Sequence, residues 1–183
     1  MPDVSTWFCI FRRFSSSISD EADATEYIIK NGYDKDSIWR QPICWGDQDS
    51  FRHVNNVHYV RFAESARIRF MECMATSAGG DARKVALLAG QGVGLILKSV
   101  TVDFKRPVVY PDTLILSQKP HTIEATQFSL TTVYYSLAQS TTVAKAESVL
   151  AWYDYNKLRK CEGPQDLVEY IRLKLPPDTG ALP

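Results

Sequence analysis

Residues that could carry out acid–base chemistry gather in one short polar segment, residues 45–56. It reads Trp-Gly-Asp-Gln-Asp-Ser-Phe-Arg-His-Val-Asn-Asn, so two carboxylates, a histidine and two asparagines fall within ten positions. Aspartate and asparagine are also the preferred turn formers and helix caps, so composition alone leaves a purely structural role open.

The segment fits the chemistry of thioester hydrolysis. That reaction needs a nucleophile or base near the acyl carbon and hydrogen-bond donors for the developing oxyanion. The first turn of a helix offers unpaired backbone N–H groups and the positive end of the helix dipole. The leaving thiol, with a pKa of about 8.5, departs as a thiolate with little need of an acid. One carboxylate beside one helix N-terminus could therefore suffice.

A long helix is expected to begin where this segment ends. Residues 56–77 contain no glycine or proline and place apolar side chains at spacings of three and four, which predicts an amphipathic helix of about six turns. Gly79 and Gly80 are expected to close it. Shorter helices are expected over residues 20–29, 82–89 and 166–173, the first folding back on the domain.

The remaining regular segments have strand patterns. Residues 37–46 predict a first strand, with Pro42 inside it favouring an edge position. Four further β-branched and aromatic runs follow the helix, at residues 93–108, 113–118, 125–138 and 142–155. Short connections indicate an antiparallel meander. The order predicts an α+β fold in which a five-stranded antiparallel sheet curls around the long helix.

Composition bounds the class of protein. The chain has 183 residues, 45% of them hydrophobic, with 21 basic and 21 acidic residues, so it has no net charge that would favour nucleic-acid binding. No apolar run approaches the ~20 residues of a membrane-spanning helix. Four widely separated cysteines and three histidines predict neither a disulfide framework nor a metal site.

The first residues differ in composition from the rest. Residues 1–36 are interpreted as an N-terminal leader, 37–175 as the folded domain, and 176–183 as a C-terminal tail. Residues 1–19 hold Arg12, Arg13 and a serine cluster but a single acid, which is the bias of a mitochondrial presequence. A leader with no targeting role, and hence a cytoplasmic protein, is the alternative.

Three motifs carry a resemblance to a known family. They are Trp45-Gly46-Asp47-x-Asp49, His53-Val54-Asn55-Asn56-x-x-Tyr59 and Phe62-Ala63-Glu64-x-Ala66-Arg67. Together they resemble the hotdog-fold thioesterases of the 4-hydroxybenzoyl-CoA thioesterase family, and the second motif also resembles plant acyl-ACP thioesterases. Residues 102–107 and 110–114 are similar to the family's long strand and the turn after it.

The resemblance implies roles for particular residues. Asp49 corresponds to the catalytic carboxylate, acting as nucleophile or as general base. Asn56 falls where a helix-start N–H polarises the thioester carbonyl. Substrate-binding positions are expected at His53, Val54, Asn55, Tyr59 and Glu64. Apart from the resemblance, the charges of Lys98, Lys105 and Arg106 could meet the phosphates of coenzyme A, with Lys105 and Arg106 taken as further substrate-binding positions.

The resemblance also implies a homodimer, or a dimer of dimers, that hydrolyses acyl-CoA or acyl-ACP without a metal or redox cofactor. Two positions depart from the family pattern. Arg52 stands where many relatives have glycine, and Phe51 replaces the asparagine of acyl-ACP thioesterases, which weakens the interpretation as an ACP enzyme. The alternative function is a non-catalytic hotdog protein with a structural or interaction role. A dehydratase would show a different histidine and aspartate motif on the helix.

Overall fold

The computed structural model describes residues 18–175, so all but the last two residues of the expected targeting segment (residues 1–19), and the whole expected tail (176–183), lie outside the described residues. The elements, in chain order, are α2 (Ile18–Lys30), η1 (Lys35–Ser37), β1 (Trp39–Pro42), η2 (Trp45–Asp47), α3 (Asn56–Leu88), β2 (Val93–Phe104), β3 (Thr113–Glu124), β4 (Gln127–Ser136), β5 (Thr141–Asp154), β6 (Arg159–Lys160) and α4 (Gln165–Leu173). None of the helices in this range is long and apolar enough to cross a membrane.

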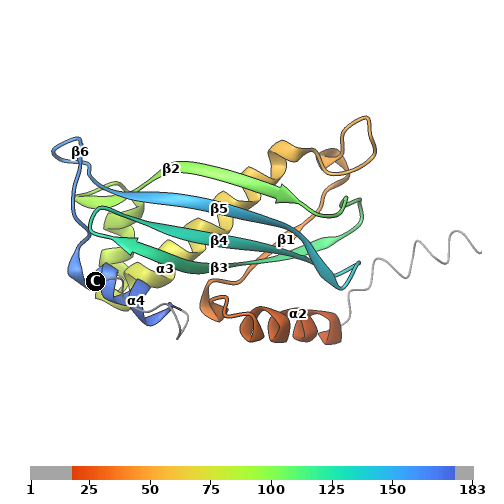
Figure 1. The fold of residues 1–183 in the computed structure, drawn as a ribbon, viewed down its shortest axis with the longest axis horizontal. Helices are drawn as coiled ribbons and strands as arrows, with labels where there is room; N and C mark the ends of the chain where they lie inside the picture. The colour runs from red at the N-terminus through yellow and green to blue at the C-terminus, as the bar shows by residue number, and fades with distance from the viewer. Residues whose placement is uncertain (1–17, 176–183) are drawn as a thin grey trace, which may run out of the picture.

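One antiparallel sheet forms the centre of the molecule. Its strand order is β1-β3-β4-β5-β2, and the short β6 pairs with β5. Helix α3 lies along one face of this sheet (Figure 1). The predicted α+β hotdog fold, a curled sheet around one long helix, is confirmed. Strands β1 and β2 form the two edges, and Pro42 lies in an edge strand as expected.

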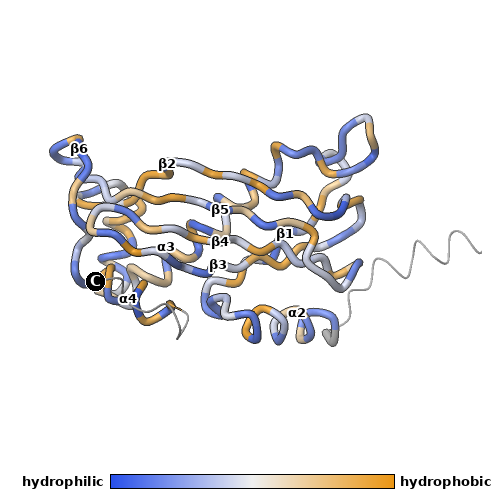
Figure 2. The backbone as a smooth tube through the Cα atoms, in the orientation of Figure 1, coloured by the Kyte–Doolittle hydropathy of each residue, from blue (hydrophilic) through white to orange (hydrophobic). Residues whose placement is uncertain are grey.

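Helix α3 buries a continuous apolar stripe against the sheet. The stripe contains Tyr59, Phe62, Ala63, Ala66, Phe70, Met71, Met74 and Ala75, all at most 6% exposed. Hydrophobic and hydrophilic residues are interspersed along the strands, while the loops at both ends of the molecule are mostly hydrophilic (Figure 2). The helix breaks at Gly79 and Gly80, the latter with φ +69°, and then continues to Leu88. The predicted break and the short helix after it are both confirmed.

The strand boundaries differ from the expected ones at three places, and one of them is the strand expected over residues 93–108, which ends at Phe104. The first strand spans only Trp39–Pro42, because the chain then turns into η2, where the Asp47 carboxylate accepts the Cys44 N–H (2.7 Å). Strand β3 continues past Gln118 to Glu124, although Pro120 lies within it. Strand β1 pairs only with residues 113–116 of β3. No strand on that side therefore needs a hydrogen bond from residue 120, where proline has no N–H to donate.

The expected N-terminal helix is present as α2 and packs on the sheet face opposite α3. Ala24 and Ile28 of α2 are fully buried, and they share one apolar cluster with Ile115 and Val133 of the sheet. The sheet is therefore covered by α3 on one face and partly by α2 on the other (Figure 1).

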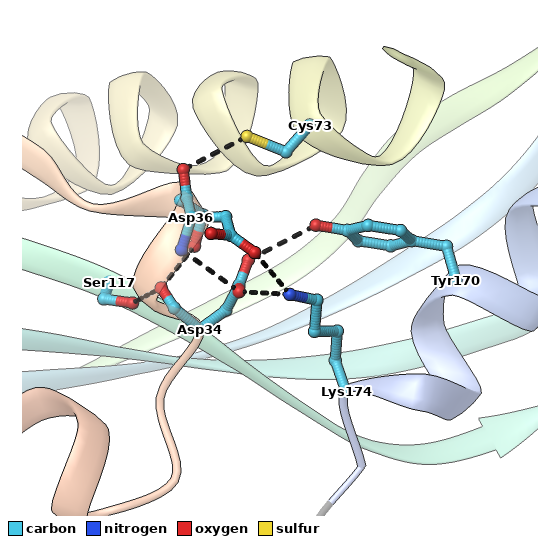
Figure 3. A network of polar contacts seen from close by, with 7 residues as sticks. Asp34, Asp36, Cys73, Ser117, Tyr170 and Lys174 are labelled. Carbon is cyan, nitrogen blue, oxygen red and sulfur yellow. Dashed lines mark hydrogen bonds and ion pairs between the residues drawn. The ribbon is translucent and has the colours of Figure 1, made fainter. Parts of the chain in front are cut away.

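A buried carboxylate joins the two ends of the described chain. The Asp34 side chain is 1% exposed, and its Oδ1 accepts a hydrogen bond from Lys174 Nζ at 2.7 Å. The same ammonium donates to Asp36 Oδ2 at 2.8 Å, and Tyr170 Oη donates to Asp34 Oδ2 at 3.4 Å (Figure 3). This network holds the end of α4 against the segment between α2 and β1.

We expect Lys174→Met to lower the free energy of unfolding by about 1–3 kcal/mol, because it leaves the buried Asp34 carboxylate without its cation. Urea denaturation at pH 7 measures the loss. The matched control is Lys157→Met, whose partner Asp154 is 3.4 Å away and whose own side chain is 65% exposed, so little change is expected there.

The pH dependence gives an independent check. The hydrogen bond from Lys174 lowers the pKa of Asp36 below its usual 3.8. A lowered carboxyl pKa stabilises the fold above pH 3.8, and that contribution is lost as the pH falls through the lower folded value. The difference in the free energy of unfolding between wild type and Lys174→Met should therefore become smaller at acidic pH. An equal difference at pH 7 and pH 3 would contradict the role of this network.

Candidate active site

A pocket of about 230 Å³ lies where α3 begins and β2 ends. Its lining residues are His53, Val54, Asn56, Tyr59, Phe104, Lys105, Arg106 and Pro107. Six of the nine site residues expected from the sequence line it, although they come from segments about 50 positions apart. Phe104 and Pro107 were not among the expected site residues. Their positions directly before Lys105 and directly after Arg106 could have indicated them from the sequence.

The segment before α3 is folded back on itself. Gln48 and Val54 form an antiparallel bridge, the Asp49 N–H donates to the His53 carbonyl (3.1 Å), and the Asn55 N–H donates to the Asp47 carbonyl (2.9 Å). Arg52 closes the turn with φ +65°. This left-handed conformation favours glycine, which gives a physical reason for the glycine expected at this position in relatives.

This turn places Asp49 directly across from His53, but the Asp49 side chain does not line the pocket. Its Oδ1 accepts the Phe51 N–H at 2.8 Å, so the carboxylate also has a structural role in the turn. The sequence left open a catalytic role and a purely structural role for this carboxylate. Its position beside the pocket, with a hydrogen bond to the backbone, is compatible with both.

The start of α3 leaves one backbone donor unpaired at a residue that lines the pocket. Asn55 is the N-cap, and its side chain accepts the Val57 N–H (3.2 Å) while its carbonyl accepts the His58 N–H (3.0 Å). Within residues 18–175, no hydrogen bond takes up the N–H of Asn56, which lines the pocket. That N–H lies at the positive end of the helix dipole and can donate to a bound carbonyl oxygen.

The floor of the pocket is aromatic. Tyr59 is 2% exposed, and its carbonyl accepts a hydrogen bond from Tyr134 Oη at 2.6 Å. Burial raises the pKa of Tyr59 to about 12. Its phenol therefore stays protonated at neutral pH and cannot serve as a general base.

Two cations stand at the mouth of the pocket. The N–H groups of Lys105 and Arg106 both donate to the Val143 carbonyl (2.9 and 3.0 Å), which anchors the chain just after β2 ends. Both side chains are exposed. They are therefore free to meet an anionic part of a ligand.

Besides Asp49, two more of the nine expected residues, Asn55 and Glu64, lie outside the pocket. Glu64 is exposed on α3, two turns beyond Asn56, and Asn55 acts as the helix cap described above. Across residues 18–175, no group of three or more His, Cys, Asp or Glu side chains is arranged to hold a metal ion.

Solved structures share this architecture. The PA2801 protein from Pseudomonas aeruginosa is 23% identical, with a TM-score of 0.62 over 73% of this chain and 96% of its own. A thioesterase from Thermus thermophilus, complexed with coenzyme A and Zn, is 20% identical, with a TM-score of 0.60 over 75% and 92%. The 1,4-dihydroxy-2-naphthoyl-CoA thioesterase from Synechocystis is 16% identical, with a TM-score of 0.59 over 74% and 94%. At these identities the similarity shows the fold.

Comparison of the sequence alone gives the family. No curated protein matches the chain. The family model of the thioesterase-like superfamily matches residues 43–171, which include the turn, all of α3 and strands β2 to β6. This match spans more than half of the sequence, and the chain therefore belongs to the thioesterase-like superfamily.

Proposed function

We propose that the protein is an acyl-CoA thioesterase, which converts an acyl-CoA and water into a free carboxylic acid and coenzyme A. The observation that carries the proposal is the unpaired Asn56 N–H, which lines a pocket beside a carboxylate at the start of α3. Membership of the thioesterase-like superfamily supports the reaction class, and the coenzyme A bound to the Thermus relative supports the carrier.

In the proposed reaction, the thioester carbonyl oxygen accepts the Asn56 N–H, and the positive end of α3 stabilises the oxyanion. Asp49 takes a proton from water, whose oxygen bonds to the acyl carbon; the C–S bond then breaks and coenzyme A leaves as the thiolate. In the second form, an Asp49 oxygen attacks the acyl carbon itself, and the C–S bond breaks as coenzyme A leaves as the thiolate. Water then hydrolyses the resulting mixed anhydride, which releases the carboxylic acid and restores the Asp49 carboxylate. Neither form draws on a metal or a redox cofactor.

The two cations at the mouth favour coenzyme A as the leaving group. Exposed Lys105 and Arg106 supply positive charge beside the pocket, where the phosphates of the nucleotide can approach. An acidic acyl carrier protein could use the same charge. Thiol release measured on the same acyl group carried by coenzyme A and by the carrier protein tests the choice, and we expect the higher kcat/KM for coenzyme A.

We also propose that two chains form the working unit through β2. This strand is 12 residues long, pairs only with β5 in the described sheet, and ends at the pocket. A long open edge favours pairing with another strand, and a two-fold axis allows β2 to pair with its own copy. Such pairing would bring each pocket to the subunit boundary.

Light scattering at micromolar concentration is expected to give a mass of about 41 kDa, twice the 20.7 kDa of one chain. The same value should persist on tenfold dilution, because an extensive strand pair dissociates weakly. A species of about 21 kDa alone would contradict both the dimer and a pocket completed by two chains.

A further inference from the structure

The floor of the candidate pocket is closed by ring contacts from two directions. Phe104, at the end of β2, meets the Tyr59 ring edge-on, with centroids 5.0 Å apart and an interplanar angle of 87°. The Tyr59 ring also lies 5.5 Å from the ring of Tyr134 in β4 and 6.4 Å from that of Phe62, measured between centroids. Three elements thus contribute aromatic rings at this one point.

The space beneath this floor is filled. Tyr59, Phe62 and Tyr134 belong to one cluster of core residues, none of them more than 4% exposed, between α3 and the sheet. The hydrogen bond from Tyr134 Oη to the Tyr59 carbonyl, at 2.6 Å, fixes the strand and the helix against each other. A chain entering the pocket therefore meets packed rings before it reaches the interior of the fold.

The part of the pocket that a single chain forms holds little. At about 30 Å³ for each water-sized group, a volume of 230 Å³ accommodates roughly eight non-hydrogen atoms. The thioester group occupies part of that space. The thioester carbon, oxygen and sulfur take about three of those positions, so an acyl group of about six carbons in all fills the pocket.

We infer that Tyr59 and Phe104 set an upper limit on the acyl group, so that the enzyme cleaves compact acyl-CoAs and excludes long fatty chains. The inference rests on the proposed thioesterase function and adds its substrate class. Phe104 is the residue to substitute in a test of this limit. It is 45% exposed, so a shorter side chain there does not open the core, whereas Tyr59 is buried.

The test is kcat/KM for straight-chain acyl-CoAs from acetyl to palmitoyl, with benzoyl-CoA as the one-ring substrate. For wild type we expect the highest values at about six carbons or fewer, or for benzoyl-CoA, and values at least tenfold lower for palmitoyl-CoA. In Phe104→Ala the longest chain cleaved well should increase by several carbons. Phe104→Leu keeps an apolar side chain of intermediate size. The longest chain that it cleaves well should therefore lie between those of wild type and Phe104→Ala.

Trp45→Ala is the matched control, because Trp45 is an aromatic side chain near the site, 75% exposed, that does not line the pocket. Its chain-length profile should equal that of wild type. A palmitoyl-CoA value equal to that of hexanoyl-CoA, or an unchanged profile in both folded Phe104 variants, would overturn the size limit while leaving the thioesterase function intact. Failure of wild type to hydrolyse any acyl-CoA would overturn the function and this inference together.

Discussion

Asp49→Asn is expected to lower kcat for acyl-CoA hydrolysis by about 10²–10⁴-fold, which is the range that general-base catalysis contributes. The asparagine keeps the size of the side chain and an oxygen that can accept the Phe51 N–H, now bonded at 2.8 Å to Asp49. It loses the negative charge that abstracts a proton or attacks the acyl carbon. The melting temperature and the binding of coenzyme A should therefore change little.

Asp47→Asn is the control for that variant. The Asp47 carboxylate accepts the Cys44 N–H and lies 3.8 Å from His58 Nδ1, and neither Asp47 nor His58 lines the pocket. Turnover should stay near the wild-type value. If Asp47→Asn abolishes hydrolysis while Asp49→Asn retains it, the catalytic carboxylate has been assigned to the wrong residue. If Asp49→Asn only lowers the melting temperature, Asp49 is a turn residue alone.

Asn56→Pro is expected to lower kcat by about 10²–10³-fold, the usual effect of removing one oxyanion donor. Proline removes the backbone N–H, which no ordinary side-chain substitution does. Asn56 is the first residue of α3, where proline is favoured because its φ angle suits a helix and its missing N–H has no helical partner. The preceding Asn55, at φ −61° and ψ 139°, already has the extended conformation that a following proline requires.

Asn56→Ala separates the backbone from the side chain, because it keeps the N–H and removes only the amide group. Its kcat should lie close to the wild-type value, and circular dichroism should report the same helix content for all three proteins. Equal losses in the alanine and proline variants would assign the role to the Asn56 side chain. Full activity in a folded Asn56→Pro would exclude this N–H as the donor.

Local sequence patterns were sufficient to predict the framework of the fold. The apolar spacing from Asn56 onward predicts a helix that buries one stripe, and α3 begins at that residue. The glycine pair predicts the break because Gly80 has a φ of +69°. Pro42 predicts an edge strand, since a proline cannot donate to a second neighbour.

Features that depend on distant parts of the chain could not be predicted in the same way. The strand expected over residues 113–118 continues to Glu124, because β1 pairs only with residues 113–116 and requires no hydrogen bond from Pro120. Phe104 looks like an ordinary strand residue until folding places its ring on Tyr59. The bond between Asp49 and the Phe51 N–H likewise arises from the turn that Arg52 closes, not from the motif itself.

The most direct test of the proposed site is a single-turnover measurement of thiol release from hexanoyl-CoA, with enzyme in excess. Wild type, Asp49→Asn and Asn56→Pro are compared in parallel, each at a concentration that saturates binding. The proposed mechanism predicts rapid release of one thiol per substrate by wild type, and rates at least about 100-fold lower in both variants while each remains folded. No release by wild type, or wild-type rates in both variants, would contradict the mechanism and favour a hotdog protein with a structural or interaction role.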